Sequence, residues 1–433
     1  MNIKDRLRLI EALPRTHGRP GRTRQAPITI LDIDINSILA GETIETPHGS
    51  FFQARRHYPD PSVHGSVTIS SVLETDPSLL AILENNQDLS GLDLKKALFI
   101  DTETTGLSGG VGTCAFLIGV GYFSDSGFIV DQYFMNDFNE EMAMLKRLSD
   151  FVRDYSAIVT YNGKSFDIPL LNSRHIYLGL TSPFEKMHHI DLLHCVRRLW
   201  NHRLQDCMLT TAESQLVTAL REGDVAGYLI PAIYFEFLSS RDPRPLKPVL
   251  YHNEKDIVAM VTLLGKACEI LENPLPQCTR AEDILRVGKL YEHAAKPDTA
   301  IKLYESYLDV HTDDFGTQDL LFQLAYAHKK RDQRSKAARI WERCIQTQPY
   351  HPLPYIELAK HFEHRAKNFK KAVALVDKAL AEIVVTEQVS GRQRWVEYRD
   401  ELEYRKRRLL RKSDRREYRQ QVKHAPSDSD DFS

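Results

Sequence analysis

The chain has 433 residues, of which 42% are hydrophobic and 27% charged, as is typical of a soluble globular protein with two or three domains. Its net charge of −2 excludes a chain-wide basic field, so a site for a polyanion must be a local patch. No apolar run reaches the roughly eighteen residues of a membrane span, the N-terminus lacks the apolar core of a secretory signal, and no Cys-x-x-Cys pair suggests zinc or disulfides. We therefore expect a cytoplasmic protein.

The first 96 residues divide into two parts. Residues 1–30 hold a short helical pattern and an Arg/Gly/Pro-rich stretch, and we expect them to be disordered. Residues 31–96 look ordered and form an N-terminal extension of the domain that follows. Within it, residues 46–58 read as a hairpin that turns at Pro47-His48-Gly49, and residues 79–94 read as a helix.

Residues 97–272 alternate strands and helices. The predicted strands are ALFIDTE, AFLIGVGYF, GFIVDQYFM, SAIVTYN and HIDLLH, and the predicted helices include NEEMAMLKRLSDFVRD, SFDIPLLNSRHIYLGL and the segment that ends in VLYHNEKDIVAMVTLLGKACEIL. Three hairpin strands followed by a strand–helix–strand crossover predict an α/β domain, a mixed sheet with helices on its faces.

Residues 281–384 carry an internal repeat. LRVGKLYEH, LFQLAYAHK and YIELAKHFE recur at a spacing of 34 to 37 residues, and TAIKLYE, KAARIWE and KAVALVD recur in phase with them. This period predicts an all-α domain of tetratricopeptide-like repeats, with an ordinary helical bundle as the alternative. The surface of such an array suits a protein or peptide partner.

Residues 391–433 begin with a segment dense in arginine and lysine and end in the acidic sequence SDSDDFS. We expect a basic helical extension followed by a disordered acidic tail. The basic segment is either a solvated helix or an arm that contacts a polyphosphate chain.

The most informative pattern is Asp101-Thr102-Glu103, at the end of the first strong strand. Side chains alternate across a strand, so the two carboxylates point to the same side. They repel each other unless a positive group lies between them, and a divalent metal ion is the usual one.

Further acidic residues stand where the same site could use them. Asp167 begins a helix within the pattern Asn162-x-x-x-Phe166-Asp167. Asp256 lies on the last helix of the domain, and His252 lies one helical turn before it on the same side. Taken singly, each acid could be a helix cap or one half of a surface salt bridge.

These three motifs resemble those of DEDD-type 3′–5′ exonucleases, which have a ribonuclease-H-like fold. More closely, DTETTGLSGGVGT, VTYNGKSFDIPLL, HIDLLHCVRRLW and VLYHNEKD resemble the YprB-type ribonuclease-H-like family, over about 40–271, in which tetratricopeptide repeats often follow. Residues 31–96 would then be an extension specific to that family.

The resemblance implies a two-metal phosphodiesterase. Asp101, Glu103, Asp167 and Asp256 would be the metal ligands, with Asp101 as the bridging one, and their hard oxygens suit two Mg²⁺ or Mn²⁺ ions. Two such ions about 4 Å apart can stabilise both the attacking and the leaving oxygen.

His252 is the candidate general base, because the pKa of a histidine lies near working pH. DEDD families place either a tyrosine with three residues between it and the last aspartate, or a histidine with four. Here His252 occupies the tyrosine spacing and Tyr251 the histidine spacing. The alternative for His252 is a supporting group hydrogen-bonded to a carboxylate.

Two further sets of residues are candidates for the substrate path. The glycine-rich turn and the second motif supply the predicted substrate-binding residues Thr104, Gly106, Leu107, Asn162, Lys164 and Phe166. A substrate role and a structural role are both open for His188, His189, Asp191, Arg197, Arg198 and Trp200. A phosphate-loop interpretation of Gly163-Lys164-Ser165 is excluded, because Ile158 stands where a glycine is required.

The sequence thus predicts a metal-dependent nuclease that acts on nucleic acid, as a 3′–5′ exonuclease on a single-stranded 3′ end. The rival functions are a structure-specific endonuclease with the same site and a non-catalytic scaffold that binds nucleic acid or protein. The sequence does not distinguish DNA from RNA, and it names neither the repeat domain's partner nor the oligomeric state.

Overall fold

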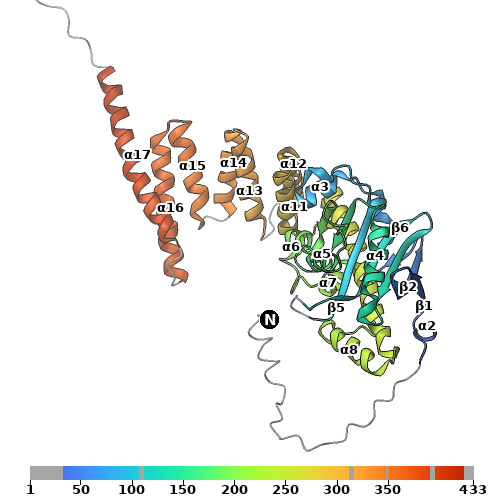
Figure 1. Ribbon diagram of the computed structural model, residues 1–433. Helices are drawn as coiled ribbons and strands as arrows, with labels where there is room; N and C mark the ends of the chain where they lie inside the picture. Colours follow the sequence, from blue (N-terminus) through green and yellow to red (C-terminus); the bar gives the residue numbers. More distant parts are fainter. Residues whose placement is uncertain (1–32, 107–111, 312–315, 348–349, 391–394, 424–433) are drawn as a thin grey trace, which may run out of the picture.

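A computed structural model describes residues 33–106, 112–311, 316–347, 350–390 and 395–423, and shows a sheet domain followed by a row of helices that extends away from it (Figure 1). The strands are β1 (Gly41–Thr46), β2 (Gly49–Pro59), β3 (Val63–His64), β4 (Val67–Thr68), β5 (Ala97–Thr104), β6 (Ala115–Ser124), β7 (Gly127–Phe134), β8 (Ala157–Thr160) and β9 (His188–Asp191). The helices of the sheet domain are α2 (Ile35–Ile38), α3 (Ser78–Glu84), α4 (Glu141–Val152), α5 (Asp167–Tyr177), α6 (Leu192–Trp200), α7 (Leu209–Ala212), α8 (Ile230–Ser240), α9 (Lys247–Glu272) and α10 (Pro274–Gln277).

The main sheet has seven strands in the order β1-β2-β7-β6-β5-β8-β9. In this order, the five strands β1-β2-β7-β6-β5 pair antiparallel, whereas β5, β8 and β9 are parallel to one another and are joined by helical crossovers. This is the predicted mixed sheet. The predicted hairpin that turns at residues 47–49 is also present, since β1 and β2 are its two strands and β2 pairs with β7.

Helices cover both faces of the sheet, as the alternation along β5 requires. Ala97 and Phe99 belong to a core shared with α3, α6 and α9, and Leu98 and Ile100 belong to a second core shared with α4, α5 and α8. Side chains two apart on a strand share a face, so the next positions of β5 continue the same alternation into the site described below.

The long helix α9 lies very close to the sheet because β6 carries glycines beneath it. A Cβ at Gly119 would lie 2.3 Å from Oδ1 of Asn253, and a Cβ at Gly121 would lie 2.4 Å from Cγ2 of Ile257. Only glycine allows the backbone of β6 and the side chains of α9 to approach this closely. Asn253 is completely buried in consequence.

One predicted helix is much shorter than expected. The pattern over residues 79–94 predicts a continuous helix, but α3 ends at Glu84 because Asn85 adopts a left-handed conformation with φ of 51°. Asparagine tolerates this conformation and often ends helices in this way. Short turns of 3-10 helix take the place of its second half.

The C-terminal region is all helical within the described residues. Its helices are α11 (Ala281–His293), α12 (Pro297–Val310), α13 (Thr317–Lys330), α14 (Arg334–Thr347), α15 (Pro352–His364), α16 (Phe369–Ser390) and α17 (Val396–Lys423). The first six pair into three successive hairpins whose start positions follow the repeat found in the sequence, and α17 packs against the last hairpin (Figure 1). The predicted architecture, a mixed-sheet domain with helices on its faces followed by helical repeats, is therefore confirmed.

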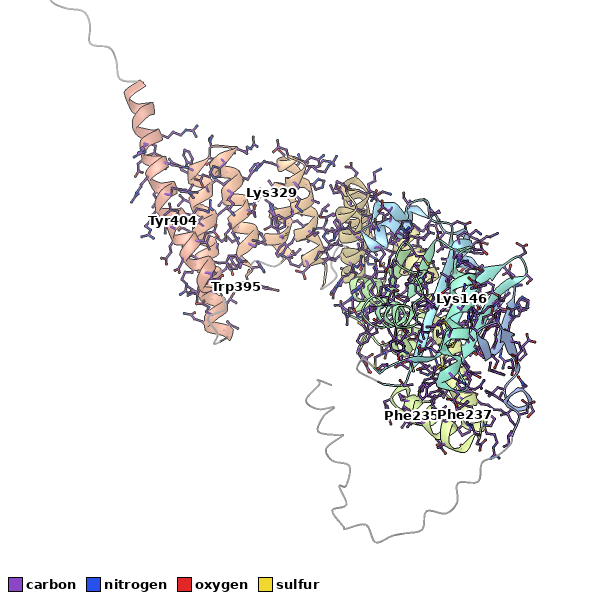
Figure 2. All side chains as sticks on the ribbon, in the orientation of Figure 1. Lys146, Phe235, Phe237, Lys329, Trp395 and Tyr404 are labelled. Carbon is purple, nitrogen blue, oxygen red and sulfur yellow. The ribbon has the colours of Figure 1, made fainter. Side chains whose placement is uncertain are left out.

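Figure 2 shows how the side chains cover both regions, with Lys146 on α4 of the sheet domain and Lys329 in the middle of the helical row. In the part of the chain that the structure describes, no helix is both long and apolar enough to cross a membrane.

Candidate active site

The end of β5 sends its polar side chains to two different faces. Asp101 and Glu103 continue the face of Phe99 and point toward α9, whereas Thr102 points toward α5. The pairing of β5 with β6 shifts between Glu103 and Thr104, which is a β-bulge of the kind that often re-aims side chains beside functional sites.

Asp101 is held by a chain of buried amides. Nδ2 of Asn253 donates to Oδ2 of Asp101 at 2.8 Å, and Oδ1 of Asn253 accepts from Nε2 of Gln132 at 2.9 Å. Gln132 also donates to the carbonyl of Leu250 at 2.7 Å. Because each amide is fixed by the next, the Asp101 carboxylate has a defined orientation.

Asp167 reaches the same strand end through the loop between β8 and α5. Asn162 in this loop has φ of 68°, and the buried carboxylate of Asp191 accepts hydrogen bonds from the backbone N–H of Asn162 at 2.7 Å and of Lys164 at 3.1 Å. The loop is thereby fixed, and Thr102 Oγ1 donates to Oδ1 of Asp167 at 2.5 Å.

Asp256 pairs with an arginine that the motifs did not include. Nη2 of Arg221 lies 2.6 Å from Oδ1 of Asp256, and Nε of Arg221 lies 2.6 Å from Oε2 of Glu213. The Arg221 side chain is only 6% exposed. Burial lowers its pKa, but Asp256 and Glu213 outweigh that effect and raise it, so Arg221 is a permanent buried cation.

His252 stands among three carboxylates. Its Nδ1 lies 2.8 Å from Oδ1 of Asp224, while its Nε2 lies 3.4 Å from Oδ2 of Asp256 and 3.9 Å from Oε1 of Glu103. The Asp224 carboxylate can only accept, so it fixes the tautomer that carries hydrogen on Nδ1. Nε2 is then the free acceptor, and it faces the acidic cluster.

The four predicted acids influence one another strongly. Burial raises the pKa of Asp101 well above its ordinary range, and the charges of Asp256 and Asp167 raise it further. Burial likewise raises the pKa of Glu103, and Asp101 adds to the effect. Burial raises the pKa of Asp167 to about 6, and it raises the pKa of Asp256 although Arg221 and His252 oppose it. The ionised cluster therefore lacks sufficient positive charge of its own.

A divalent ion suits this donor set chemically. Asp101, Glu103, Asp167 and Asp256 supply hard oxygen donors, and a dication would offset the repulsion that raises their pKa values. In this structure Arg221 occupies Oδ1 of Asp256 instead. Among the residues that the structure describes, no three histidine, cysteine or carboxylate side chains are grouped as ligands of one ion.

The predicted substrate-binding residues that the structure describes differ in how far their side chains are exposed or engaged. Phe166 is 57% exposed beside Asp167, and Thr104 Oγ1 donates to the carbonyl of Gly106 at 2.7 Å. Nζ of Lys164 lies 2.9 Å from Oε2 of Glu84 on α3, so its ammonium is engaged there. Leu107 lies outside the described residues.

Several of the open candidates have clear structural roles. His189 Nε2 lies 2.8 Å from Oγ1 of Thr160, and burial lowers the pKa of His189 to about 4, so it is neutral. Asp191 caps α6 by accepting from Leu193 N–H at 3.1 Å. Trp200 is 2% exposed and cannot stack on a base.

The neighbouring candidates give a similar result. Arg198 donates to the carbonyl of Leu83 and lies 3.5 Å from Glu84, which ties α6 to α3. His188 begins β9 and is partly exposed, and Arg197 is exposed on α6. No contact in the described residues brings any of these three to the acidic cluster.

Sequence reasoning missed four residues that complete the site: Glu213, Arg221, Asp224 and Asn253. A signal was present for two of them, because Arg221-Glu222-Gly223-Asp224 is a compact charged turn with Gly223 at φ of 73°. Asn253 carried a signal too, since it follows His252 on the helix and is the only buried amide of that motif.

Comparisons with known proteins identify the family of this chain. The model of the RNase_H superfamily matches residues 98–268. YprB of Bacillus subtilis (strain 168), itself described as uncharacterized, is 32% identical over 336 residues, which cover 75% of this chain and 79% of that protein.

Solved structures are more distant. A crystal structure of MamA covers 35% of this chain and 90% of its own at 18% identity, with a TM-score of 0.23. A family B DNA polymerase from Pyrobaculum calidifontis covers 49% of this chain and 29% of its own at 17% identity, with a TM-score of 0.32. TM-scores this low do not establish a common fold. The sequence relationship to YprB, in contrast, shows the family. The chain belongs to the YprB family, with an RNase H superfamily domain at residues 98–268.

Proposed function

We propose that this protein is a metal-dependent nuclease that hydrolyses phosphodiester bonds as a 3′–5′ exonuclease, using two Mg²⁺ or Mn²⁺ ions. The observation that carries the proposal is the meeting of Asp101, Glu103, Asp167 and Asp256 at one end of β5, with electrostatic coupling among them. Membership of the RNase H superfamily supports the broader class, a hydrolase that acts on nucleic acid.

The four acids would hold the ions. Bound there, the ions would stabilise the negative charge that develops on the attacking and leaving oxygens and would acidify a water molecule. Asn253 and Thr102 keep Asp101 and Asp167 in place for this task, since each donates a hydrogen bond to one carboxylate oxygen and leaves the other available.

His252 supplies the proton acceptor in this proposal. With Nδ1–H donated to Asp224, Nε2 is free to take a proton from a water molecule near Glu103 and Asp256. After the transfer, the imidazolium lies against three carboxylates, which stabilise it. Asp224 therefore both selects the reactive tautomer and supports the charged product of the proton transfer.

Arg221 holds this arrangement together. It contacts Asp256 and Glu213 at 2.6 Å and Asp224 at 3.3 Å. Its charge compensates part of the negative charge of the cluster before any ion is bound, and its three contacts fix the acids on either side of His252.

The three helical hairpins of the C-terminal region recur at a spacing of 34 to 37 residues, which supports the assignment of this region to the tetratricopeptide class.

The test is a cleavage assay with the full chain and oligonucleotides labelled at either end. We expect Mg²⁺- or Mn²⁺-dependent release of single nucleotides from a free 3′ end, and none from a blocked one. Asp101→Ala and Asp167→Ala should each abolish release. Asp150→Ala is the matched control, because Asp150 is a 42% exposed aspartate on α4, away from the cluster.

Each other outcome identifies a rival function. Internal products from strands with blocked 3′ ends would indicate an endonuclease that uses the same site. Absence of cleavage together with absence of Mn²⁺ binding at low millimolar concentration would indicate a scaffold. Unchanged cleavage by both alanine variants would refute the site assignment.

A further inference from the structure

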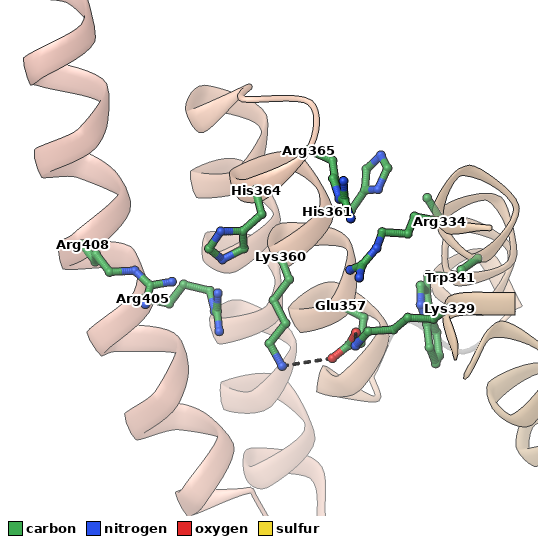
Figure 3. A pocket seen from close by; sticks show the side chains of 12 residues that line it. Lys329, Arg334, Trp341, Glu357, Lys360, His361, His364, Arg365, Arg405 and Arg408 are labelled. Carbon is green, nitrogen blue, oxygen red and sulfur yellow. Dashed lines mark hydrogen bonds and ion pairs between the residues drawn. The ribbon is translucent and has the colours of Figure 1, made fainter. Parts of the chain in front are cut away.

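A strongly basic cavity opens in the helical row, far along the chain from the acidic cluster. Its volume is about 290 Å³, and it is lined by the end of α13 and by α14, α15 and α17 (Figure 3). Six cationic side chains line it: Lys329, Arg334, Lys360, Arg365, Arg405 and Arg408. Glu357 is the one acidic side chain in that lining.

Nearby acids compensate only part of this charge. Glu357 accepts hydrogen bonds from Lys329 and from Lys360, and the buried Glu363 binds Arg405 and Arg408. These carboxylates hold the cationic groups in place. Arg405 is only 8% exposed, whereas Arg408 is 36% exposed, so the guanidinium of Arg408 keeps donors that a ligand can reach.

The most open cations of the cavity are weakly compensated. Arg334 and Arg365 are 43% and 55% exposed and share a single acid, Asp332, which is itself 71% exposed. Burial lowers the pKa of His361 and of His364, the carboxylates of Glu342 and Glu363 oppose this, and the neighbouring cations add to it, so both histidines are neutral at neutral pH. The six cationic side chains against the single Glu357 therefore leave the lining of the cavity with a net positive charge.

A second cavity of about 660 Å³ lies in the same helical row. It opens between α11 and α13 and is lined by Lys289, His293, Lys330 and Arg331, with Glu292 as its acidic residue. Lys330 is 76% exposed. The C-terminal end of α13 stands between the two cavities, because Lys329 lines one while Lys330 and Arg331 line the other.

We propose that these two cavities form one continuous basic track that binds the phosphodiester backbone of a single-stranded nucleic acid, an inference that rests on the proposed nuclease function. The track is defined by the cationic residues that line the two cavities. Its charges recur over three successive hairpins, which matches a ligand with one negative charge at every repeat unit. The α11 end of the track is also the end that packs against the sheet domain.

An extended peptide is the less suitable ligand. A groove that recognises a peptide through apolar side chains needs pockets for those anchors. None of the exposed large apolar side chains in the described residues lines either cavity, and the apolar lining consists of Ala295, Pro297, Ala327, Ala337, Ala338 and the 1% exposed Trp341. A highly acidic peptide remains the relevant competitor, and the experiment includes it.

The experiment measures binding rather than cleavage, with the full chain in EDTA and a fluorescent single strand of about 20 nucleotides. The test variant combines Lys330→Ala, Arg334→Ala and Arg365→Ala. The matched control combines Lys302→Ala, Arg339→Ala and Lys370→Ala, which removes equal charge from exposed positions of the same helical row outside both cavities. Thermal unfolding confirms that both variants are folded.

We expect the test variant to bind the strand about 10-fold or more weakly than wild type in 0.1 M salt. The slope of log affinity against log salt should fall by about 2, since each lost phosphate contact on a single strand removes about 0.7. The control variant should stay within about 2-fold of wild type. Equal losses in the two variants would overturn the track, because they would show a nonspecific effect of charge.

A peptide of alternating Asp and Glu is the competing probe. If it binds wild type more tightly than the strand does, and the test variant loses that binding, the nucleic-acid assignment is wrong. The outcome is also independent of the active site. If the chain binds strands through the track but never cleaves them, the proposed nuclease function is wrong and the track is still supported. If the chain cleaves short strands but the test and control variants bind long strands equally well, the track is wrong and the nuclease function is unaffected.

Discussion

Asp224→Asn tests the arrangement around His252 most directly. The carboxylate accepts Nδ1–H of His252 at 2.8 Å and thereby leaves Nε2 unprotonated. An asparagine of the same shape can donate to Nδ1 instead, which moves the hydrogen to Nε2 and removes the proton acceptor. It also removes the negative charge that stabilises the imidazolium.

The structure sets the size of the expected effect. A positioned general base contributes about 10²–10⁴-fold to a rate, so loss of the correct tautomer should lower kcat by about 10²–10³-fold with KM within about 2-fold. The fold should survive, because Arg221 keeps its two contacts of 2.6 Å with Glu213 and Asp256 and loses only the 3.3 Å contact with Asp224. We expect a cost of about 1 kcal/mol in unfolding free energy.

The assay is steady-state release of nucleotides at saturating Mg²⁺. Glu222→Gln is the matched control, since Glu222 is an exposed acid in the same turn. If Asp224 acts through His252, the double variant with His252→Gln is no slower than His252→Gln alone. An Asp224→Asn variant that keeps wild-type kcat, or multiplicative losses in the double variant, would refute the reasoning.

Three further predictions concern stability and packing. The pKa of Asp167 is raised from 3.8 to about 6, so the stability linked to this group is complete below pH 3.8 and is lost as pH rises through 6. Asp167→Asn should therefore raise the unfolding free energy at pH 7.5 in EDTA by on the order of 2 kcal/mol while abolishing cleavage. A lower melting temperature of the variant in EDTA would contradict this. Burial raises the pKa of Glu363, but Lys412 and Arg408 outweigh burial and lower that pKa from 4.5 to about 2, so the stability linked to this group is complete above pH 4.5 and is lost as pH falls toward 2. In Glu363→Gln the unfolding free energy should fall less steeply over that interval, by up to about 3 kcal/mol. An unchanged dependence of the unfolding free energy on pH would contradict this. Gly119→Ala places a Cβ 2.3 Å from the Asn253 amide and should cost about 1–3 kcal/mol in thermal unfolding and lower the cleavage rate, whereas Gly91→Ala, with open space around it, should do neither.

Much of the fold could be predicted because its patterns are local. Alternation and glycine turns placed the strands around β5 and β6, and the repeat spacing placed the helical hairpins. The helix over residues 79–94 was wrong because its apolar spacing continues past Asn85, whereas the backbone there turns left-handed. Such a termination depends on one residue's conformation and on packing against α9, which periodicity does not contain.

The candidate site could be located from the sequence only where it follows motifs. Asp101, Glu103, Asp167 and Asp256 each lie within a pattern of fixed internal spacing, and in the structure the charges of these four acids act on one another. Arg221 could not be found in that way, since it lies in a loop 35 residues before Asp256 and meets it only through the tertiary fold. The role of Glu213 is similarly invisible, because its partners His64 and Arg221 come from distant segments.

The regions that carry the basic track and the acidic cluster share one hydrophobic core, so the helical row holds a defined position relative to the sheet domain. A single hydrophobic core runs from the face of the sheet through α9 into the first two hairpins. Polar contacts seal the joint: the buried Asp283 of α11 lies 2.8 Å from Nε2 of His202, and Tyr291 donates to the carbonyl of Leu271 at 2.7 Å. This interface does not bend freely, because bending would expose buried apolar surface and would leave the buried Asp283 carboxylate without its partner. A strand held along the track would therefore reach the sheet domain at a fixed position, and the length of strand needed to span the two would be a property of the fold.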